Sequence, residues 1–131
     1  MKFYGLLAVG GGATSGAWLR WWFGTVLNPV FPTIPLGTLA ANLLAGLLIG
    51  VVVELSAQYA ALPPEFRLFA VTGFLGGLST FSTFSSEVVT LALRQQYGWA
   101  LAEISIHVAG SLALTVLGMF IVRFLMARGS L

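Results

Sequence analysis

Apolar residues form four long runs along this chain, and short polar or proline-containing stretches separate the runs. The runs are Phe3–Leu27, Pro35–Ala57, Phe66–Leu93 and Trp99–Phe124. Each is long enough to cross the hydrocarbon core of a bilayer, which takes about 20 helical residues. The pattern predicts an all-α membrane protein in which residues 1–131 form a single domain of four transmembrane helices.

The composition supports this interpretation and excludes a soluble protein. Of the 131 residues, 58% are hydrophobic and only 8% are charged, which is too few charges for a water-soluble surface of ordinary polarity. The chain has no cysteine, which excludes thiolate metal sites and disulfides. The positive charges are scattered singly, so the expected surroundings are a lipid bilayer and no nucleic-acid partner is expected.

The positive charges specify the orientation of the chain only weakly. Four spans place both termini on one side of the membrane. That side would hold Lys2, Arg67, Arg123 and Arg128, and the other side Arg20 and Arg94. Orientation follows the excess of Lys and Arg on one side, and this excess is small. Insertion in both directions is therefore conceivable.

Glycines recur four residues apart in three of the runs. The pairs are Gly12/Gly16, Gly46/Gly50 and Gly73/Gly77. This spacing lets the backbones of transmembrane helices approach closely. Four slim helices with so many packing faces favour an oligomer, and we expect a homodimer because two-fold assemblies are the commonest.

The stretch GGLSTFSTFSSE, Gly76–Glu87, interrupts the third run with polar residues. Ser79 lies thirteen residues into that run, so at about 1.5 Å per residue the stretch falls near the bilayer midplane. Paired glycines followed by Ser-Thr predict a break in the third helix, and broken helices at this depth commonly bind ions. In the alternative interpretation, the hydroxyls bond to their own helix and the phenylalanines only pack.

Two further spans carry polar residues at hydrocarbon depth. His107, Ser111 and Thr115 are four residues apart and form a stripe on one face of the fourth span. Asn42 follows Pro35 by seven residues, which places it about 10 Å inside the second span. Such residues either serve transport or join helices by hydrogen bonds, and for His107 and Asn42 both roles are open.

The polar residues suit an anion better than a cation. Asparagine amides and Ser and Thr hydroxyls donate hydrogen bonds. Phe81 and Phe84 share one face of a helix. A phenyl ring favours an anion when its edge faces the path and a cation when its face does. The sequence leaves the orientation of the rings open.

The charged residues near the span ends have simpler expected roles. Arg20 lies among the tryptophans of an interfacial belt and is expected to snorkel outward rather than anchor a buried network. Glu87 either pairs with Arg94 or faces a pore mouth. Glu103, one turn from Trp99, is expected to be solvated. An enzyme is not expected, since a Ser–His dyad would lack a third group to orient the histidine.

Three segments together resemble the Fluc, or CrcB, family of bacterial fluoride channels. They are GGGATSGAWLRW at Gly10–Trp21, PLGTLAANL at Pro35–Leu43 and GGLSTFSTFSSE at Gly76–Glu87, and the resemblance covers nearly the whole chain. It implies an antiparallel, dual-topology homodimer in the bacterial plasma (inner) membrane. It also implies two fluoride pores and a structural sodium ion at the dimer centre.

The resemblance also assigns roles to individual residues. The anion pathway would contain Asn42, Phe81, Phe84, Ser82, Thr83, Ser85, Ser111 and Thr115. Glu87 and Arg20 would lie at the pore mouth, and the backbone carbonyls of Gly76 and Ser79 would bind sodium. The family usually has threonine where this chain has Ser79, but a backbone ligand does not depend on that difference.

The expected function is a passive, fluoride-selective channel that exports cytoplasmic fluoride. One alternative is a proton-coupled multidrug exporter of the small multidrug resistance type. Such an exporter needs a buried carboxylate in its first span, and this chain has none there. A non-transporting membrane scaffold subunit is the other alternative, and it leaves the central polar stretch unexplained.

Overall fold

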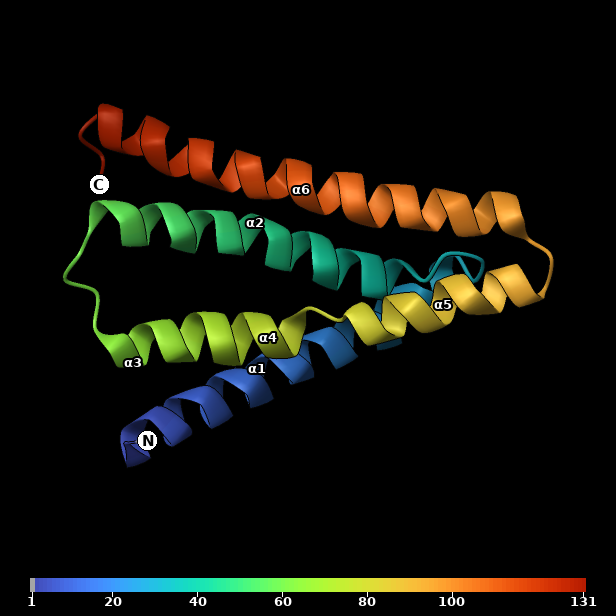
Figure 1. Ribbon diagram of the computed structural model, residues 1–131, viewed down its shortest axis with the longest axis horizontal. Helices are drawn as coiled ribbons and strands as arrows, with labels where there is room; N and C mark the ends of the chain where they lie inside the picture. Colours follow the sequence, from blue (N-terminus) through green and yellow to red (C-terminus); the bar gives the residue numbers. More distant parts are fainter. Residues whose placement is uncertain (1) are drawn as a thin grey trace.

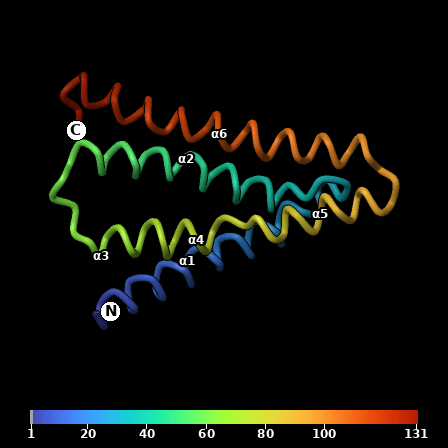
Figure 2. Tube along the Cα trace, viewed as in Figure 1, coloured from blue at the N-terminus to red at the C-terminus, as the bar shows by residue number. Residues whose placement is uncertain are grey.

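The computed structural model describes residues 2–131 and contains four helical passes with both termini at one end (Figures 1 and 2). The first two passes are α1 (Phe3–Leu27), followed by the turn η1 (Asn28–Val30), and α2 (Leu36–Gln58). The third comprises α3 (Pro64–Arg67), η2 (Leu68–Leu75), α4 (Gly76–Leu78) and α5 (Phe81–Leu93), and the fourth is α6 (Tyr97–Ala127). The predicted all-α fold with four passes is confirmed.

Three passes are long and apolar enough to cross a membrane by length and composition, namely α2, Pro64–Leu93 and α6. The first pass, α1, has 25 residues and therefore the necessary length. Its glycines, its tryptophans and Arg20 make it less apolar than the others. Trp18 and Trp21 are exposed on its surface, as an interfacial aromatic belt requires.

The turn before α2 supplies that helix with its cap. The first amides of a helix have no partner within the helix. Asn28 Oδ1 accepts hydrogen bonds from the backbone N–H groups of Gly37 (2.7 Å) and Thr38 (3.3 Å). The Asn28-Pro29 turn therefore both ends the first pass and starts the second.

Glycines bring the passes into backbone contact, as their spacing predicts. A Cβ atom on Gly12 or Gly16 would overlap backbone atoms of the third pass, and one on Gly50 would overlap the carbonyl of Thr115 in α6. Gly77 is helical, and a Cβ atom there would overlap the carbonyl of Ala13 in α1. Gly77 therefore serves packing, and the break in the third pass begins two residues after it.

A small apolar core lies where α1, α2 and the third pass meet. Its buried members are Ala41, Ala45, Leu75 and Leu78, with partly buried Leu19 and Phe23 against them. On its other side α2 packs against α6, and α6 also contacts α5 (Figure 1). The broken part of the third pass therefore has α1, α2 and α6 as its neighbours.

Candidate functional site

The third pass is broken at Ser79 and Thr80, where Figure 1 shows a thin connection between α4 and α5. Both residues have extended backbones, with φ −75° and ψ 151° at Ser79 and φ −149° and ψ 110° at Thr80. Thr80 caps α5, because its Oγ1 accepts a hydrogen bond from the N–H of Thr83 at 3.1 Å. The predicted break in the third helix is confirmed.

Asn42 of α2 compensates for the break. Its Oδ1 accepts from the backbone N–H of Thr80 at 2.7 Å, and its Nδ2 donates to the carbonyl of Thr80 at 3.0 Å. One side-chain amide thus serves both backbone groups of Thr80, which the broken helix leaves without partners. Nδ2 also contacts Nδ1 of His107 at 3.2 Å. In this structure Asn42 therefore has the role of a packing clamp, with both amide hydrogens engaged.

Arg20 of α1 supports the break from the opposite side. Its Nε donates to the carbonyl of Gly77 at 3.0 Å. The expectation that Arg20 snorkels outward is wrong, because the broken helix offers its guanidinium an acceptor inside the protein. Arg20 also lines a hollow of about 520 Å³ together with Thr38, Thr80 and Thr83.

The carbonyls of Gly76 and Ser79 receive no hydrogen bond from the residues that the structure describes. The N–H of Thr80, which would reach Gly76 in a continuous helix, bonds to Asn42 instead. The N–H of Thr83, which would reach Ser79, bonds to the Thr80 side chain. Gly76 and Ser79 are both exposed residues at the break.

The two phenylalanines of the central stretch contact one another but differ in burial. Their ring centroids are 5.6 Å apart and the rings are tilted by 54°. Phe81 is 79% exposed, whereas Phe84 is 8% exposed and lies against the ring of His107, with centroids 4.6 Å apart. Phe81 thus extends from the surface of the chain, and Phe84 belongs to its interior.

An open groove of about 520 Å³ runs along the break between α2, the third pass and α6. Four of the predicted pathway residues line it, namely Asn42, Phe81, Phe84 and Ser111. Gly76, Ser79 and His107 line it as well. The fold therefore brings the predicted donor groups, the rings and the free carbonyls to one surface.

The remaining hydroxyls of the predicted pathway lie elsewhere. Thr83 lines the hollow beside Arg20 and accepts from the Thr80 hydroxyl at 3.0 Å. The Thr115 hydroxyl donates to the carbonyls of Gly46 and Ser111, both at 2.9 Å, so it joins α6 to α2. Ser82 is exposed and Ser85 is half-buried, both on α5, and neither lines the groove or the hollow.

Glu87 lies on the inner side of α5. Its Oε1 accepts from the Thr38 hydroxyl at 2.6 Å. In the described part of the chain no ion pair joins Glu87 to Arg94. Thr38, which bonds to Glu87, and Thr80, which caps α5, were not among the predicted site residues. A threonine directly before an apolar residue such as Phe81 is nevertheless a recognisable helix cap.

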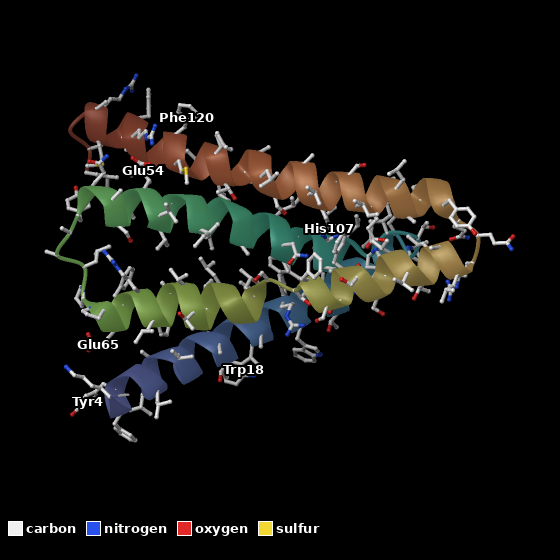
Figure 3. All side chains as sticks on the ribbon, in the orientation of Figure 1. Tyr4, Trp18, Glu54, Glu65, His107 and Phe120 are labelled. Atoms are coloured by element: carbon white, nitrogen blue, oxygen red, sulfur yellow. The ribbon has the colours of Figure 1, made fainter. Side chains whose placement is uncertain are left out.

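Glu103 contradicts the expectation that it is solvated, since it is 0% exposed. It lies one turn before His107, which is 4% exposed and lies on the inner side of α6 (Figure 3). The short distance along α6 from Trp99 to Glu103 indicates the depth of Glu103 in the membrane. It does not indicate which face of α6 Glu103 lies on. The four-residue step from Thr115 through Ser111 and His107, continued once more, would have placed it on the buried face.

Comparisons with known proteins decide the family. Residues 7–119 match the family described as CrcB-like protein, camphor resistance. The chain belongs to this CrcB-like family. A relative from Nitrosospira multiformis is 61% identical over 125 residues, covering 95% of this chain and 98% of the relative. One from Cupriavidus taiwanensis is 56% identical over 121 residues, covering 92% and 96%. Both are named fluoride-specific ion channel FluC.

Membership of the CrcB-like family confirms two expectations. The resemblance to this family is correct, and because the relatives are named as ion channels the chain is not an enzyme. All the candidate residues, from Arg20 to Thr115, lie within the matched segment. The chain is therefore a membrane protein of a fluoride channel family whose candidate site is the broken third helix.

Proposed function

We propose that the chain is a passive, fluoride-selective channel that lets cytoplasmic fluoride leave a bacterial cell across its plasma (inner) membrane. The observation that carries the proposal is the 61% identity to a fluoride-specific ion channel over nearly the whole length of both chains. The groove along the break supplies a surface where fluoride can exchange its water for protein donors.

Fluoride is small and strongly hydrated, so its transfer requires hydrogen-bond donors along the way. The Ser111 hydroxyl lines the groove and donates to no other described residue, so it is free to bind the ion. The hydroxyls of Ser82, Thr83 and Ser85 lie outside the groove and would continue the pathway along α5, with Thr83 in the hollow beside Arg20. The N-terminus of α5 lies at the break, and a helix N-terminus favours negative charge.

Asn42 can bind fluoride only if it gives up an existing hydrogen bond. Its two amide hydrogens bond to the Thr80 carbonyl and to His107. A fluoride ion receives a hydrogen bond from Asn42 only when one of these bonds is exchanged. The contact with His107, at 3.2 Å, is the longer one and the one whose exchange leaves the clamp on Thr80 intact.

A proton-coupled multidrug exporter and a scaffold subunit are weaker proposals. The described part of α1 carries no carboxylate that would trade protons for substrate. A scaffold would not need a groove that combines free carbonyls, hydroxyls and rings. Fluoride efflux from liposomes that contain the purified protein is the basic test of the channel.

We further propose an antiparallel homodimer with two pores. Phe81 is 79% exposed and the groove beside it is open along its length, so a second copy would bury both. The small excess of Lys and Arg on the side of the termini permits both orientations. Two-fold symmetry would give each dimer two equivalent grooves.

Labelling of a single engineered cysteine tests the dual topology. Val30 is exposed in the turn between α1 and α2, and the chain has no cysteine of its own. We expect Val30→Cys to react with a membrane-impermeant reagent added to either side of the membrane, while the parent chain stays unlabelled. Reaction from one side only would rule out the antiparallel dimer.

A structural sodium ion at the dimer centre is also proposed. The free carbonyls of Gly76 and Ser79 fit it, because hard cations prefer oxygen ligands and two copies would provide two pairs. Sodium would bind backbone carbonyls to which lipid can donate no hydrogen bond. Fluoride efflux should then follow the fluoride gradient unchanged when the sodium gradient is reversed. Efflux that reverses with the sodium gradient would identify a coupled transporter instead.

The phenylalanine rings provide the sharpest test of the pathway. Ile at either position keeps an apolar side chain but removes the positive ring edge that a phenyl group presents. We expect Phe81→Ile and Phe84→Ile to lower fluoride efflux about tenfold in proteins that still elute as dimers. Phe120→Ile, at a position 61% exposed on α6, serves as the control and should conduct normally (Figure 3).

If the rings serve only packing, the outcome differs. Phe84→Ile would then conduct like the parent and show its effect as lower stability, because Phe84 is buried. Phe81→Ile would then have little effect on either the conduction or the stability of the protein. Normal conduction by both variants as dimers would leave the hydroxyls and Asn42 to bind the ion.

A further inference from the structure

Three titratable side chains form a cluster behind the groove. Ligand atoms of Glu87, Glu103 and His107 all lie within 4.8 Å of one another. Glu87 Oε2, both carboxylate oxygens of Glu103 and Nε2 of His107 are buried and have no hydrogen-bond partner among the described residues. Buried polar atoms without partners are costly, so the cluster lacks something that would bind there.

Within residues 2–131, no positively charged side chain lies within ion-pair distance of Glu87, and the only ion-pair contact of Glu103 is with His107. From α2, the Thr38 hydroxyl and the Asn42 amide face the cluster, while Glu54 of that helix pairs with Arg123. From α1, Arg20 donates to the Gly77 carbonyl. Apart from Glu87, Glu103 and His107, the helices α5 and α6 bring no titratable group within ion-pair distance in the described part of the chain. The missing component is therefore a cation.

The hydrogen bonds of Asn42 show which kind of cation fits. The backbone N–H of Thr80 can only donate, so the Asn42 atom 2.7 Å away is the oxygen, and Nδ2 faces His107. Nδ1 of His107 must then accept, which places the imidazole proton on Nε2. That N–H faces the carboxylates, 3.9 Å from Glu103 Oε1, and a protonated nitrogen cannot bind a metal ion. The tautomer favours a proton over a metal ion.

We propose that Glu87 and Glu103 share one proton and that this proton-binding site controls fluoride conduction, an inference that rests on the proposed channel function. A proton bound to one carboxylate oxygen converts COO⁻ to COOH, removes the repulsion between the two groups and gives an unpaired oxygen a donor. The site communicates with the groove through His107, whose ring lies 4.6 Å from that of Phe84.

Loss of the proton has a defined consequence for the anion path. It adds one negative charge to the cluster, in a region that protein shields from water. That charge opposes an anion in the groove, which Phe84 and His107 line. Fluoride conduction should therefore be highest on the acid side and fall as the pH rises.

Infrared spectroscopy of the purified protein tests the proton without any transport. We expect the carbonyl band of a protonated carboxylic acid at neutral pH in the parent. The band should be lost in Glu103→Gln and kept in Glu65→Gln, a matched change at an exposed residue of α3. Absence of the band from the parent would overturn the proposal. So would zinc binding that Glu103→Gln abolishes, because the site would then bind a metal.

The pH dependence of fluoride efflux tests whether the proton-binding site controls conduction. At pH values well above the pKa of hydrofluoric acid, with empty liposomes as the background, parent efflux should fall about tenfold as the pH rises. Glu103→Gln, checked as a dimer by size exclusion, should keep the acid-side rate throughout, and Glu65→Gln should follow the parent. If efflux by the parent protein does not change with pH, the proton-binding site does not control conduction. This conclusion holds even if Glu103→Gln fails to fold.

The two readouts separate this inference from the proposed function. A parent protein that shows the carboxylic acid band but moves no fluoride at any pH contradicts the channel and leaves proton binding intact. A parent that conducts fluoride independently of pH and lacks the band contradicts the proton site and leaves the channel intact.

Discussion

The pairing of the Asn42 amide with both backbone groups of Thr80 is the interaction on which the site depends. An open peptide group is costly at hydrocarbon depth, so a transmembrane helix breaks only where protein supplies partners. Asn42 supplies them to Thr80, and Arg20 supplies one to Gly77. With the break held in this way, α5 begins beside the groove that the break lines, and the carbonyls of Gly76 and Ser79 remain free.

Polar groups from all four passes gather around this break, while large apolar side chains cover much of the outside of the protein. Arg20 comes from α1, Asn42 and Thr38 from α2, Glu87 from α5 and His107 from α6. The glycines make this possible, because backbone contact between passes lets short side chains reach across. In the proposed channel, the donors that repair the helix would also offer fluoride a replacement for its water, so stability and conduction would depend on one network.

Local rules were sufficient to predict the four passes, the close contacts at glycines and the break in the third helix. Each of these depends on runs, spacings or dipeptides that are visible in the chain itself. The partners across the break were not predictable, because Asn42 and Thr80 are 38 residues apart and either could have bonded within its own helix. Arg20 and Glu103 were misjudged for a related reason: their positions along a helix indicate depth, whereas their burial depends on which neighbour each face meets.

Backbone chemical shifts of Ser79 and Thr80 in bilayers, measured by solid-state NMR, test the central claim most directly. For the parent protein the account predicts extended shifts at these two residues between helical neighbours. Asn42→Leu, which keeps the volume but removes the amide, should shift both residues away from the extended values and lower fluoride efflux from the same samples. Helical shifts at Ser79 and Thr80 in the parent, or unchanged extended shifts in Asn42→Leu, would contradict the account.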